Sequence, residues 1–250
     1  MNLELNGKVA LVTGSSKGIG KDIANLLKKE GCQVVYNGRN EKNLKIALKD
    51  SENSEYYVAD VTKTKDCEKL VKHVIKKFGQ MDILVCNVGN GNSMEQGSET
   101  IKEWKKMLDE NFFSAINVIN ASRKFLKKTN GCIICISSIA GIETTGAPIT
   151  YSVAKSALIS YVKRISKTFA DEGIRINTVS PGNILFGGST WEKKLKQNKN
   201  QVNKMLETNV SLKRFGTPEE ISNLVVFLAS SKSSFTTGAN FVIDGGQIKS

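Results

Sequence analysis

The chain has 250 residues, 40% of them hydrophobic, and a formal net charge of +12 from 36 basic and 24 acidic side chains. This length suits a single domain over residues 1–250, with enough apolar content for a sizeable core. No apolar run reaches the roughly 18 residues that cross a bilayer, and the polar start MNLELNGK lacks the basic and apolar regions of a signal peptide, so we expect a cytoplasmic protein outside the membrane.

Apolar runs typical of strands alternate with amphipathic runs typical of helices along the chain. The expected strands cover residues 8–13, 32–36, 55–59, 82–86, 131–137, 174–179 and 240–243. The expected helices cover residues 18–30, 41–49, 64–78, 101–127, 150–171 and 218–229. This alternation predicts an α/β fold with a doubly wound, seven-stranded parallel sheet, helices on both faces and ligands at the carboxyl ends of the strands.

A glycine-rich turn follows the first expected strand and leads into a helix. Gly14, Gly18 and Gly20 lie in this turn, where glycine permits a tight bend and a close approach of a phosphate. The amino end of the helix offers free N–H groups and a partial positive charge to a pyrophosphate. Strand, turn and helix in this order predict a Rossmann dinucleotide site with contacts from Gly14, Ser16, Lys17, Gly18, Ile19 and Gly20.

The end of the second expected strand should determine which dinucleotide binds. An acidic residue there would accept hydrogen bonds from an unmodified adenosine ribose, whereas a phosphate on that ribose calls for cations. This chain has Gly38 followed by Arg39, whose guanidinium can hold a phosphate with two hydrogen bonds, and Lys17 can add a second charge. The pattern predicts NADP(H) rather than NAD(H). The alternative is that Arg39 only begins the next helix as a solvated residue.

A tyrosine and a lysine lie four residues apart in the helix expected at 150–171. Tyr151 and Lys155 would therefore leave the same helix face one turn apart. A tyrosine hydroxyl with a pKa of about 10 is a poor acid at neutral pH, and we expect the Lys155 ammonium to favour the phenolate. Ser138 follows the apolar run 131–137 and should face this helix. Such a set can move a proton to or from a substrate oxygen, although an isolated pair of this kind is common on helix surfaces.

These stretches together resemble the short-chain dehydrogenase/reductase family over nearly the whole chain. The family pattern TGxxxGxG matches Thr13, Gly14, Gly18 and Gly20, and the catalytic positions match Asn111, Ser138, Tyr151 and Lys155. Further cofactor positions of the family match Asp60, Val61, Asn87, Gly89, Pro181, Gly182 and Ile184, and Tyr151 and Lys155 are expected to contact the cofactor as well. Among members of the family, the chain most resembles the 3-oxoacyl-carrier-protein reductase type.

The resemblance implies hydride transfer between the nicotinamide of NADP(H) and a carbonyl or secondary alcohol carbon. In reduction Tyr151 would donate the proton and Ser138 would hold the substrate oxygen. Lys155 would also bind the nicotinamide ribose, and Asn111 would hold a water that relays protons. Adjacent strand residues face opposite sides, so only one of Ser137 and Ser138 can face the substrate. The spacing between serine and tyrosine in the family favours Ser138. The resemblance also implies a homotetramer built through helices 101–127 and 150–171 and the last strand.

Several residues depart from the family pattern. Val88 replaces the usual alanine and Cys86 the first asparagine of the run that ends the fourth strand. Phe186 stands near the threonine that commonly bonds the nicotinamide carboxamide, so Ser189, Thr190 or backbone groups would have to replace that contact. The loops at 89–98 and after Pro181 usually set the substrate. A 3-oxoacyl thioester is our first expectation, and a sugar, nucleotide-sugar, steroid or other secondary alcohol is the alternative.

Residues 183–215 are expected to form a lid over the substrate. The lysines of this segment are Lys193, Lys194, Lys196, Lys199 and Lys204. They can attract an acidic carrier protein, coenzyme A or an anionic sugar, or simply form a solvated helix. Nucleic acid is not expected as a partner, because no basic stripe with interleaved aromatic residues is present. A dinucleotide sensor or scaffold is the non-enzymatic alternative, and the matched catalytic set argues against it.

The cysteines and the single histidine suggest neither a disulfide framework nor a metal site. Cysteines occupy positions 32, 67, 86, 132 and 135. Cys132 and Cys135 have metal-like spacing, but in a strand they would point to opposite faces, so we expect core thiols. His73 lies in an amphipathic run without a cluster of carboxylates or cysteines, and we expect it at the surface.

Overall fold

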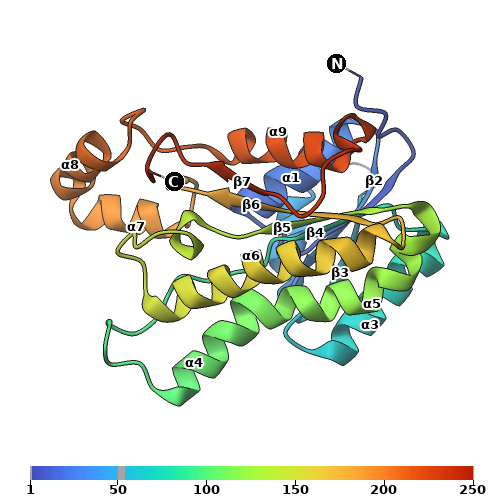
Figure 1. Ribbon diagram of the computed structural model, residues 1–250, viewed down its shortest axis with the longest axis horizontal. Coiled ribbons are helices and arrows are strands. Elements are labelled where there is room, and N and C mark those ends of the chain that lie inside the picture. Colours follow the sequence, from blue (N-terminus) through green and yellow to red (C-terminus); the bar gives the residue numbers. More distant parts are fainter. Residues whose placement is uncertain (1, 50–53, 250) are drawn as a thin grey trace.

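Seven parallel strands form one sheet in the order β3-β2-β1-β4-β5-β6-β7 (Figure 1). The computed structural model describes residues 2–49 and 54–249. The strands are β1 (Val9–Val12), β2 (Gln33–Gly38), β3 (Glu55–Val58), β4 (Ile83–Cys86), β5 (Cys132–Ile136), β6 (Arg175–Pro181) and β7 (Asn240–Ile243). The predicted single α/β domain with a seven-stranded parallel sheet is confirmed.

The helices of the described residues agree with the sequence pattern except in two places. They are α1 (Gly18–Lys29), α2 (Glu41–Ala47), α3 (Thr64–Phe78), α4 (Ile101–Leu108), α5 (Ser114–Thr129), α6 (Ile149–Ala170), α7 (Thr190–Gln197), α8 (Lys199–Asn209) and α9 (Pro218–Ala229). The helix expected over 101–127 is interrupted, because a π-helical turn over Asp109–Phe113 separates α4 from α5. The segment expected as a lid contains two helices, α7 and α8, that the pattern did not separate.

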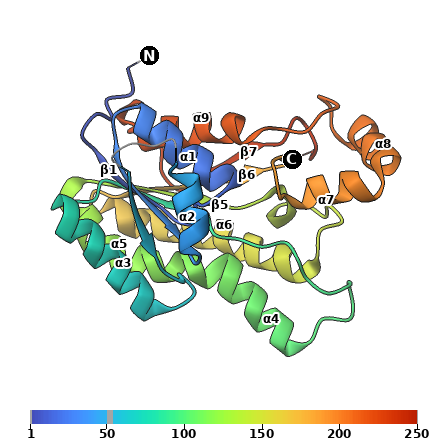
Figure 2. The same ribbon diagram turned by 180° about the vertical axis from the view of Figure 1, so that it is seen from behind.

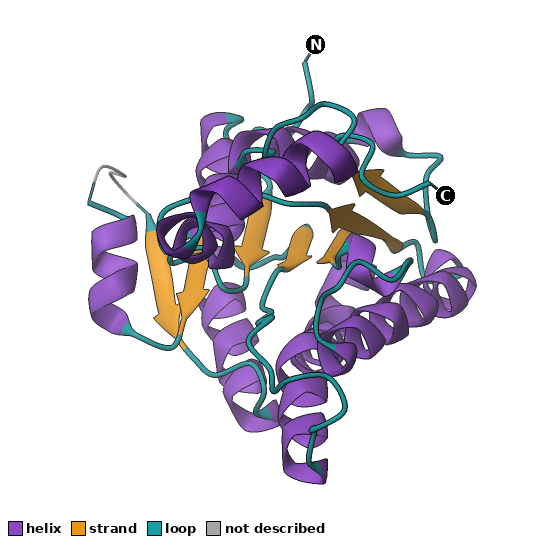
Figure 3. Ribbon diagram, turned by 90° about the vertical axis from the view of Figure 1, so that its left-hand side faces the viewer, coloured by secondary structure: helices purple, strands orange, loops and turns teal. Residues whose placement is uncertain are grey.

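Helices cover both faces of the sheet, as Figures 2 and 3 show. The buried side chains of α1 and α9 pack on one face, and those of α3, α5 and α6 pack on the other. Because both faces are covered, the strands are almost continuously apolar. Cys132 and Cys135 lie in the two different cores, so the prediction of buried thiols on opposite faces is confirmed. None of the described helices is both long and apolar enough to cross a membrane.

The order of the strands reverses at β1, which pairs with β2 on one side and with β4 on the other. Such a switch point is where doubly wound sheets bind their ligands. Asn87, directly after β4, ties the two strand ends together. Its backbone N–H donates to Thr13 Oγ1 at 3.0 Å, and its side-chain amide donates to the carbonyls of Thr13 and Gly14, both at 3.1 Å. The loops that follow β1 and β4 are therefore held as one unit.

Candidate active site

A cavity of about 1020 Å³ opens at the carboxyl ends of the strands. The glycine-rich turn, the ends of β2, β4, β5 and β6, the start of α6 and parts of α7 and α8 surround it. The predicted site residues that line it are Gly14, Ser16, Lys17, Ile19, Gly20, Arg39, Asp60, Val61, Asn87, Gly89, Ser138, Tyr151, Lys155, Pro181, Gly182 and Ile184. Gly18 and Asn111 lie behind this lining.

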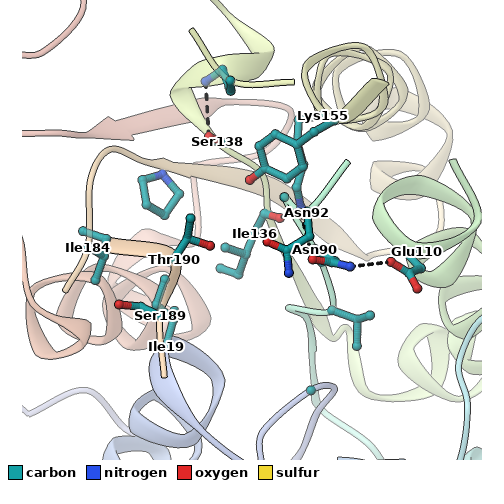
Figure 4. A pocket seen from close by; sticks show the side chains of 18 of the residues that line it. Ile19, Asn90, Asn92, Glu110, Ile136, Ser138, Lys155, Ile184, Ser189 and Thr190 are labelled. Atoms are coloured by element: carbon teal, nitrogen blue, oxygen red, sulfur yellow. Dashed lines mark hydrogen bonds between the residues drawn. The ribbon is translucent and has the colours of Figure 1, made fainter. Parts of the chain in front are cut away.

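The two adjacent serines after β5 have different surroundings. Ser137 is buried, and its hydroxyl donates to the backbone carbonyl of Lys155 at 3.0 Å. Ser138 faces the cavity (Figure 4), where its oxygen accepts a hydrogen bond from the N–H of Ala140 at 3.2 Å. Burial raises the pKa of the Tyr151 phenol, and the Ser138 hydroxyl offsets part of that rise. The geometry thus favours Ser138 as the serine that can contact a substrate oxygen.

Tyr151 and Lys155 leave α6 one turn apart at the cavity wall, as the spacing predicts. Burial raises the pKa of Tyr151 above its usual value, so the net direction in this structure is opposite to the lowering expected from Lys155 alone. The Lys155 ammonium donates to the carbonyl of Ile136 at 2.9 Å and lies 5.8 Å from the centre of the tyrosine ring. Burial also lowers the pKa of Lys155, to about 8. Tyr151 therefore carries its proton at neutral pH, and burial makes the phenol a weaker acid than it is in water.

Asn111 lies in the π-helical turn and is 1% exposed. Its side-chain oxygen accepts from the N–H of Asn90 at 2.8 Å, and its amide donates to the carbonyls of Asn90 and Met107, both at 3.0 Å. A Cβ atom built on Gly89 would lie 3.0 Å from both Asn111 Oδ1 and Lys155 Nζ. Asn111 therefore stands beside Lys155 and fixes the loop after β4. A π turn is frequent at functional sites, and the sequence pattern gave no sign of it here.

The opposite end of the cavity has the features of a dinucleotide site. Gly18 has a φ of +56°, and a Cβ on Gly20 would lie 2.6 Å from the carbonyl oxygen of Gly14, so both positions require glycine. The amino end of α1 begins at this turn. Arg39 and Lys17 are exposed at the rim, and Arg39 has no ion-pair partner among the residues that the structure describes. These residues fit a dinucleotide that carries an additional phosphate.

Phe186 packs against the glycine-rich turn. A Cβ on Gly18 would lie only 2.4 Å from the aromatic ring, so the ring lies directly over that backbone position. Ser189 is buried, and its hydroxyl caps α7 by accepting from the N–H of Glu192 at 3.1 Å. Thr190 lines the cavity, as Figure 4 shows. Of the side chains expected to replace the family threonine, Ser189 is thus occupied as a helix cap and Thr190 faces the site.

The substrate side of the cavity is lined mainly by the two segments expected there. Asn90 and Asn92 come from the loop 89–98, and Trp191, Met205 and Asn209 come from the segment 183–215, whereas Glu110 in the π turn was not expected. Of the five lysines in the expected lid, Lys194 lines the cavity, and its ammonium lies 4.7 Å from the centre of the Trp191 ring. The sequence offered one signal for Glu110, namely its position directly before the predicted site residue Asn111.

His73 is not the isolated surface residue that the sequence suggested. Its ring is half-buried against Tyr57, with 4.7 Å between the ring centres, and its Nε2 lies 3.0 Å from Glu55 Oε1. Glu55 lies on β3, so this partner is distant in the sequence and only the fold brings it close. Within residues 2–49 and 54–249, no group of histidine, cysteine and acidic side chains could hold a metal ion.

Comparison with known proteins identifies the family. The family model described as "Enoyl-(Acyl carrier protein) reductase" matches residues 14–247. The 3-oxoacyl-[acyl-carrier-protein] reductase FabG of Thermotoga maritima is 31% identical over 251 residues, which cover 98% of this chain and 100% of that protein. Glucose 1-dehydrogenase 2 of Bacillus subtilis is 31% identical over 254 residues, which cover 98% of this chain and 96% of that protein.

A solved structure agrees over the full length of both chains. The L-sorbose reductase of Gluconobacter frateurii, solved as a complex with NADPH and L-sorbose, superimposes with a TM-score of 0.93, 29% sequence identity and 100% coverage of each chain. The likeness thus extends over both the sequence and the fold. The chain therefore belongs to the short-chain dehydrogenase/reductase family of NAD(P)-dependent oxidoreductases.

Proposed function

We propose that this enzyme uses NADP(H) to interconvert a carbonyl compound and a secondary alcohol, and that it acts as a reductase. The observation that carries the proposal is a single cavity with two ends. Ser138, Tyr151 and Lys155 line one end, and the glycine-rich turn with Lys17 and Arg39 lines the other. A dinucleotide lying along the strand ends would connect them.

In this proposal the bound nicotinamide supplies the hydride, and the side chains of the protein handle the proton. Tyr151 donates its proton to the substrate oxygen, and the groups around it must offset the rise in pKa that burial causes. The Ser138 hydroxyl holds the same oxygen and stabilises the phenolate that remains. Lys155 retains its charge below about pH 8, and this charge favours the phenolate as it forms. Asn111 keeps the loop beside Lys155 in place.

The preference for NADP(H) rests on the presence of Arg39 and on the absence of an acidic side chain at the neighbouring position 38. Gly38 ends β2 without a carboxylate, and Arg39 follows it at the rim of the cavity. A Cβ at Gly38 would make only ordinary contacts, the nearest at 3.5 Å, so sterics alone do not explain the missing acidic side chain. The related L-sorbose reductase was solved with NADPH, which supports the assignment.

Two substrate classes enter the proposal. A 3-oxoacyl thioester is supported by the names of several relatives, and the exposed lysines Lys193, Lys199 and Lys204 of α7 and α8 would suit an acidic carrier protein. A keto sugar is supported by the L-sorbose reductase and glucose dehydrogenase relatives.

A cytoplasmic location is part of the proposal, because all five cysteines are free and buried, which suits a reducing compartment.

A homotetramer also belongs to the proposal. Large apolar side chains are exposed on α4, the π turn and α6, namely Ile101, Phe113, Ile149 and Val153. A second exposed set, Phe227, Phe235 and Val242, lies on α9, the following loop and β7. Exposed apolar groups on the predicted contact helices and on the last strand are what two separate subunit contacts require.

The Tyr151→Phe variant tests the proposed reaction. Removing the phenol oxygen removes the proton donor, so the kcat for NADPH-dependent reduction of the best substrate in a carbonyl panel should fall by ~10² to 10⁴. The Kd for NADPH, measured by isothermal titration calorimetry, should change by less than about twofold, because the binding contacts remain. Tyr161→Phe removes the same atom from the same helix and serves as the control. Full turnover in Tyr151→Phe, or failure of the wild type on every carbonyl and alcohol, would contradict the proposal and favour a cofactor sensor.

A further inference from the structure

One wall of the substrate cavity carries polar groups that the proposed reaction does not use. We call it the polar wall and define it as Asn90, Asn92 and Glu110, which all line the cavity. In Figure 4 these three side chains lie together on one side of the cavity, and Ser189 and Thr190 lie on the other. Asn90 and Asn92 come from the loop after β4, and Glu110 comes from the π turn.

Hydrogen bonds hold the polar wall at a fixed position. The amide of Asn90 donates to Glu110 Oε2 at 3.0 Å, and its side-chain oxygen accepts from the N–H of Asn92 at 3.0 Å. Further along the loop, Gln96 donates to the carbonyl of Ala147 at 2.9 Å. The loop is therefore anchored both to the π turn and to the segment that precedes α6, and the side chains of Asn90 and Glu110 are held against each other.

The polar wall also adjoins the proposed reacting groups. Asn90 follows Gly89, and a Cβ on Gly89 would lie 3.0 Å from Lys155 Nζ. Glu110 precedes Asn111, whose side chain bonds to the backbone of Asn90. A substrate whose carbonyl reaches Tyr151 would therefore place its neighbouring atoms against this wall.

The wall offers hydrogen-bonding capacity that the described residues leave unused. Glu110 Oε2 accepts from Asn90, and no described residue donates to Oε1. The side-chain amide of Asn92 has no bonded partner among the described residues either. A carboxylate accepts hydrogen bonds only, whereas an amide both donates and accepts. Together they match a row of hydroxyl groups, which can donate to Glu110 and exchange bonds with Asn92.

The two substrate classes of the proposed function meet this wall differently. An aliphatic acyl chain lying against Glu110 would strip water from a carboxylate and give it no partner, which is costly. A polyhydroxylated chain would replace that water with hydroxyl donors. Trp191 also lines the cavity and is held against Phe215 with 5.3 Å between the ring centres, so its indole is a fixed apolar surface that the C–H groups of a sugar can contact.

We infer that the substrate is a polyhydroxylated carbonyl compound of the keto-sugar class, with Glu110 and Asn92 selecting hydroxyl groups near the reacting carbon. This inference rests on the proposed function and chooses between its two substrate classes. Glu110 and Asn92 are then specificity-determining residues that act in addition to Ser138, Tyr151 and Lys155.

The test compares carbonyl substrates that carry a row of hydroxyl groups with carbonyl substrates that lack one. L-sorbose and D-fructose have the same number of carbons as 2-hexanone, and acetoacetyl-coenzyme A represents the thioester class. The wild type should reduce at least one ketose with a higher kcat/KM than 2-hexanone or the thioester. In Glu110→Ala the ratio of kcat/KM for that ketose to kcat/KM for 2-hexanone should fall by about 10- to 100-fold, the effect of losing one hydrogen bond to a charged group. Glu110→Gln keeps the shape and should lose less.

Asp109→Asn provides the matched control, because Asp109 precedes Glu110 in the same π turn, is exposed and does not line the cavity. Its ketose-to-hexanone ratio should stay within about twofold of that of the wild type. A second measurement does not depend on turnover. Saturation-transfer NMR should detect binding of sorbitol to the wild type and to Asp109→Asn, with a loss of signal in Glu110→Ala.

The other outcomes would contradict either the substrate inference alone or the proposed reductase function as well. A wild type that prefers acetoacetyl-coenzyme A or 2-hexanone to every ketose overturns the inference and leaves the proposed reductase function standing. An equal loss on both substrates in Glu110→Ala also overturns the inference, because Glu110 would then only hold the loop. A wild type that reduces none of the carbonyls with either cofactor overturns the proposed function as well.

Discussion

Lys155 carries its positive charge at a position from which water is largely excluded. It is 3% exposed, and its ammonium donates to the carbonyl of Ile136. Burial lowers the pKa of Lys155 to about 8, whereas burial raises the pKa of the neighbouring Tyr151. As the pH rises, the lysine therefore loses its proton first, while the tyrosine still holds its own.

This order of titration predicts the pH dependence of reduction. The kcat/KM for NADPH-dependent reduction should be flat below about pH 8 and fall by about tenfold for each further pH unit, because deprotonation removes the charge that favours the phenolate. Lys155→Arg should be slower at every pH but should lack the decline near pH 8, since a guanidinium stays charged. A wild-type profile that is flat to pH 10, or the same decline in Lys155→Arg, would refute this assignment.

Arg39 permits a test of cofactor choice. Arg39→Asp replaces the proposed phosphate-binding cation with a carboxylate, so the ratio of kcat/KM for NADPH to kcat/KM for NADH should fall by at least about tenfold, the cost of a lost charge-assisted hydrogen bond. Steady-state kinetics with both cofactors measure this ratio. Lys42→Asp makes the same charge change on α2 at a position outside the cavity and should leave the ratio unchanged. An unaltered ratio in Arg39→Asp would contradict the role given to the guanidinium.

At the residue scale, the sequence predicted what depends on local spacing. Tyr151 and Lys155 lie one turn apart on a helix, and Ser138 follows a buried strand. The sequence pattern therefore predicts that the three side chains line the same part of the cavity. The pKa of Tyr151 could not be predicted in this way, because it depends on burial in the folded chain. The position of Phe186 over Gly18 also escaped prediction, since the two residues are far apart in the sequence.

At the scale of elements, α9 begins with a complete capping box. Thr217 Oγ1 accepts from the N–H of Glu220 at 3.4 Å, and Glu220 Oε2 accepts from the N–H of Thr217 at 2.9 Å. Pro218 occupies the first turn, where its missing N–H costs nothing. These groups satisfy backbone donors that would otherwise lack partners, so they stabilise a helix that packs on the sheet.

The cap gives a prediction about stability. Thr217→Ala should lower the free energy of unfolding by about 1 kcal/mol, which corresponds to a melting temperature about 2–4 °C lower for a chain of this size. Thr217→Ser keeps the hydroxyl and should melt close to the wild type. Differential scanning calorimetry makes the comparison, and equal melting of the alanine and serine variants would show that the cap contributes nothing measurable.

The helices that the sequence pattern missed are short and polar. In α7 no residue is buried, and in α8 only Val202 and Leu206 are, so the apolar stripe of each helix is too short to reveal it. Their caps were the available signal, because Ser189 precedes Glu192 by three residues and Asn198 precedes Gln201 by three. The π turn had no such signal, since the apolar pattern runs through it without a break.

At the scale of the whole molecule, the exposed apolar side chains predict how subunits assemble. The protein should elute as a particle of four times the chain mass of 27.3 kDa in size-exclusion chromatography with light scattering. Val153→Glu places a charge on the exposed α6 face and should reduce the assembly to dimers or monomers, because a charge buried without a partner is costly. Ile46→Glu changes another exposed apolar side chain, on α2, and should leave the mass unchanged. A monomeric wild type would contradict the assembly.

The contact between Trp191, Phe215 and Lys194 has a practical consequence for following motion. The chain has two tryptophans, and Trp104 lies on α4, away from this contact. Replacing Trp104 by phenylalanine leaves one indole, whose emission responds to the ring and the ammonium beside it. A ligand that moves α7 away from Phe215 should then change the emission wavelength and intensity of Trp191 fluorescence, so its binding can be followed without an attached dye.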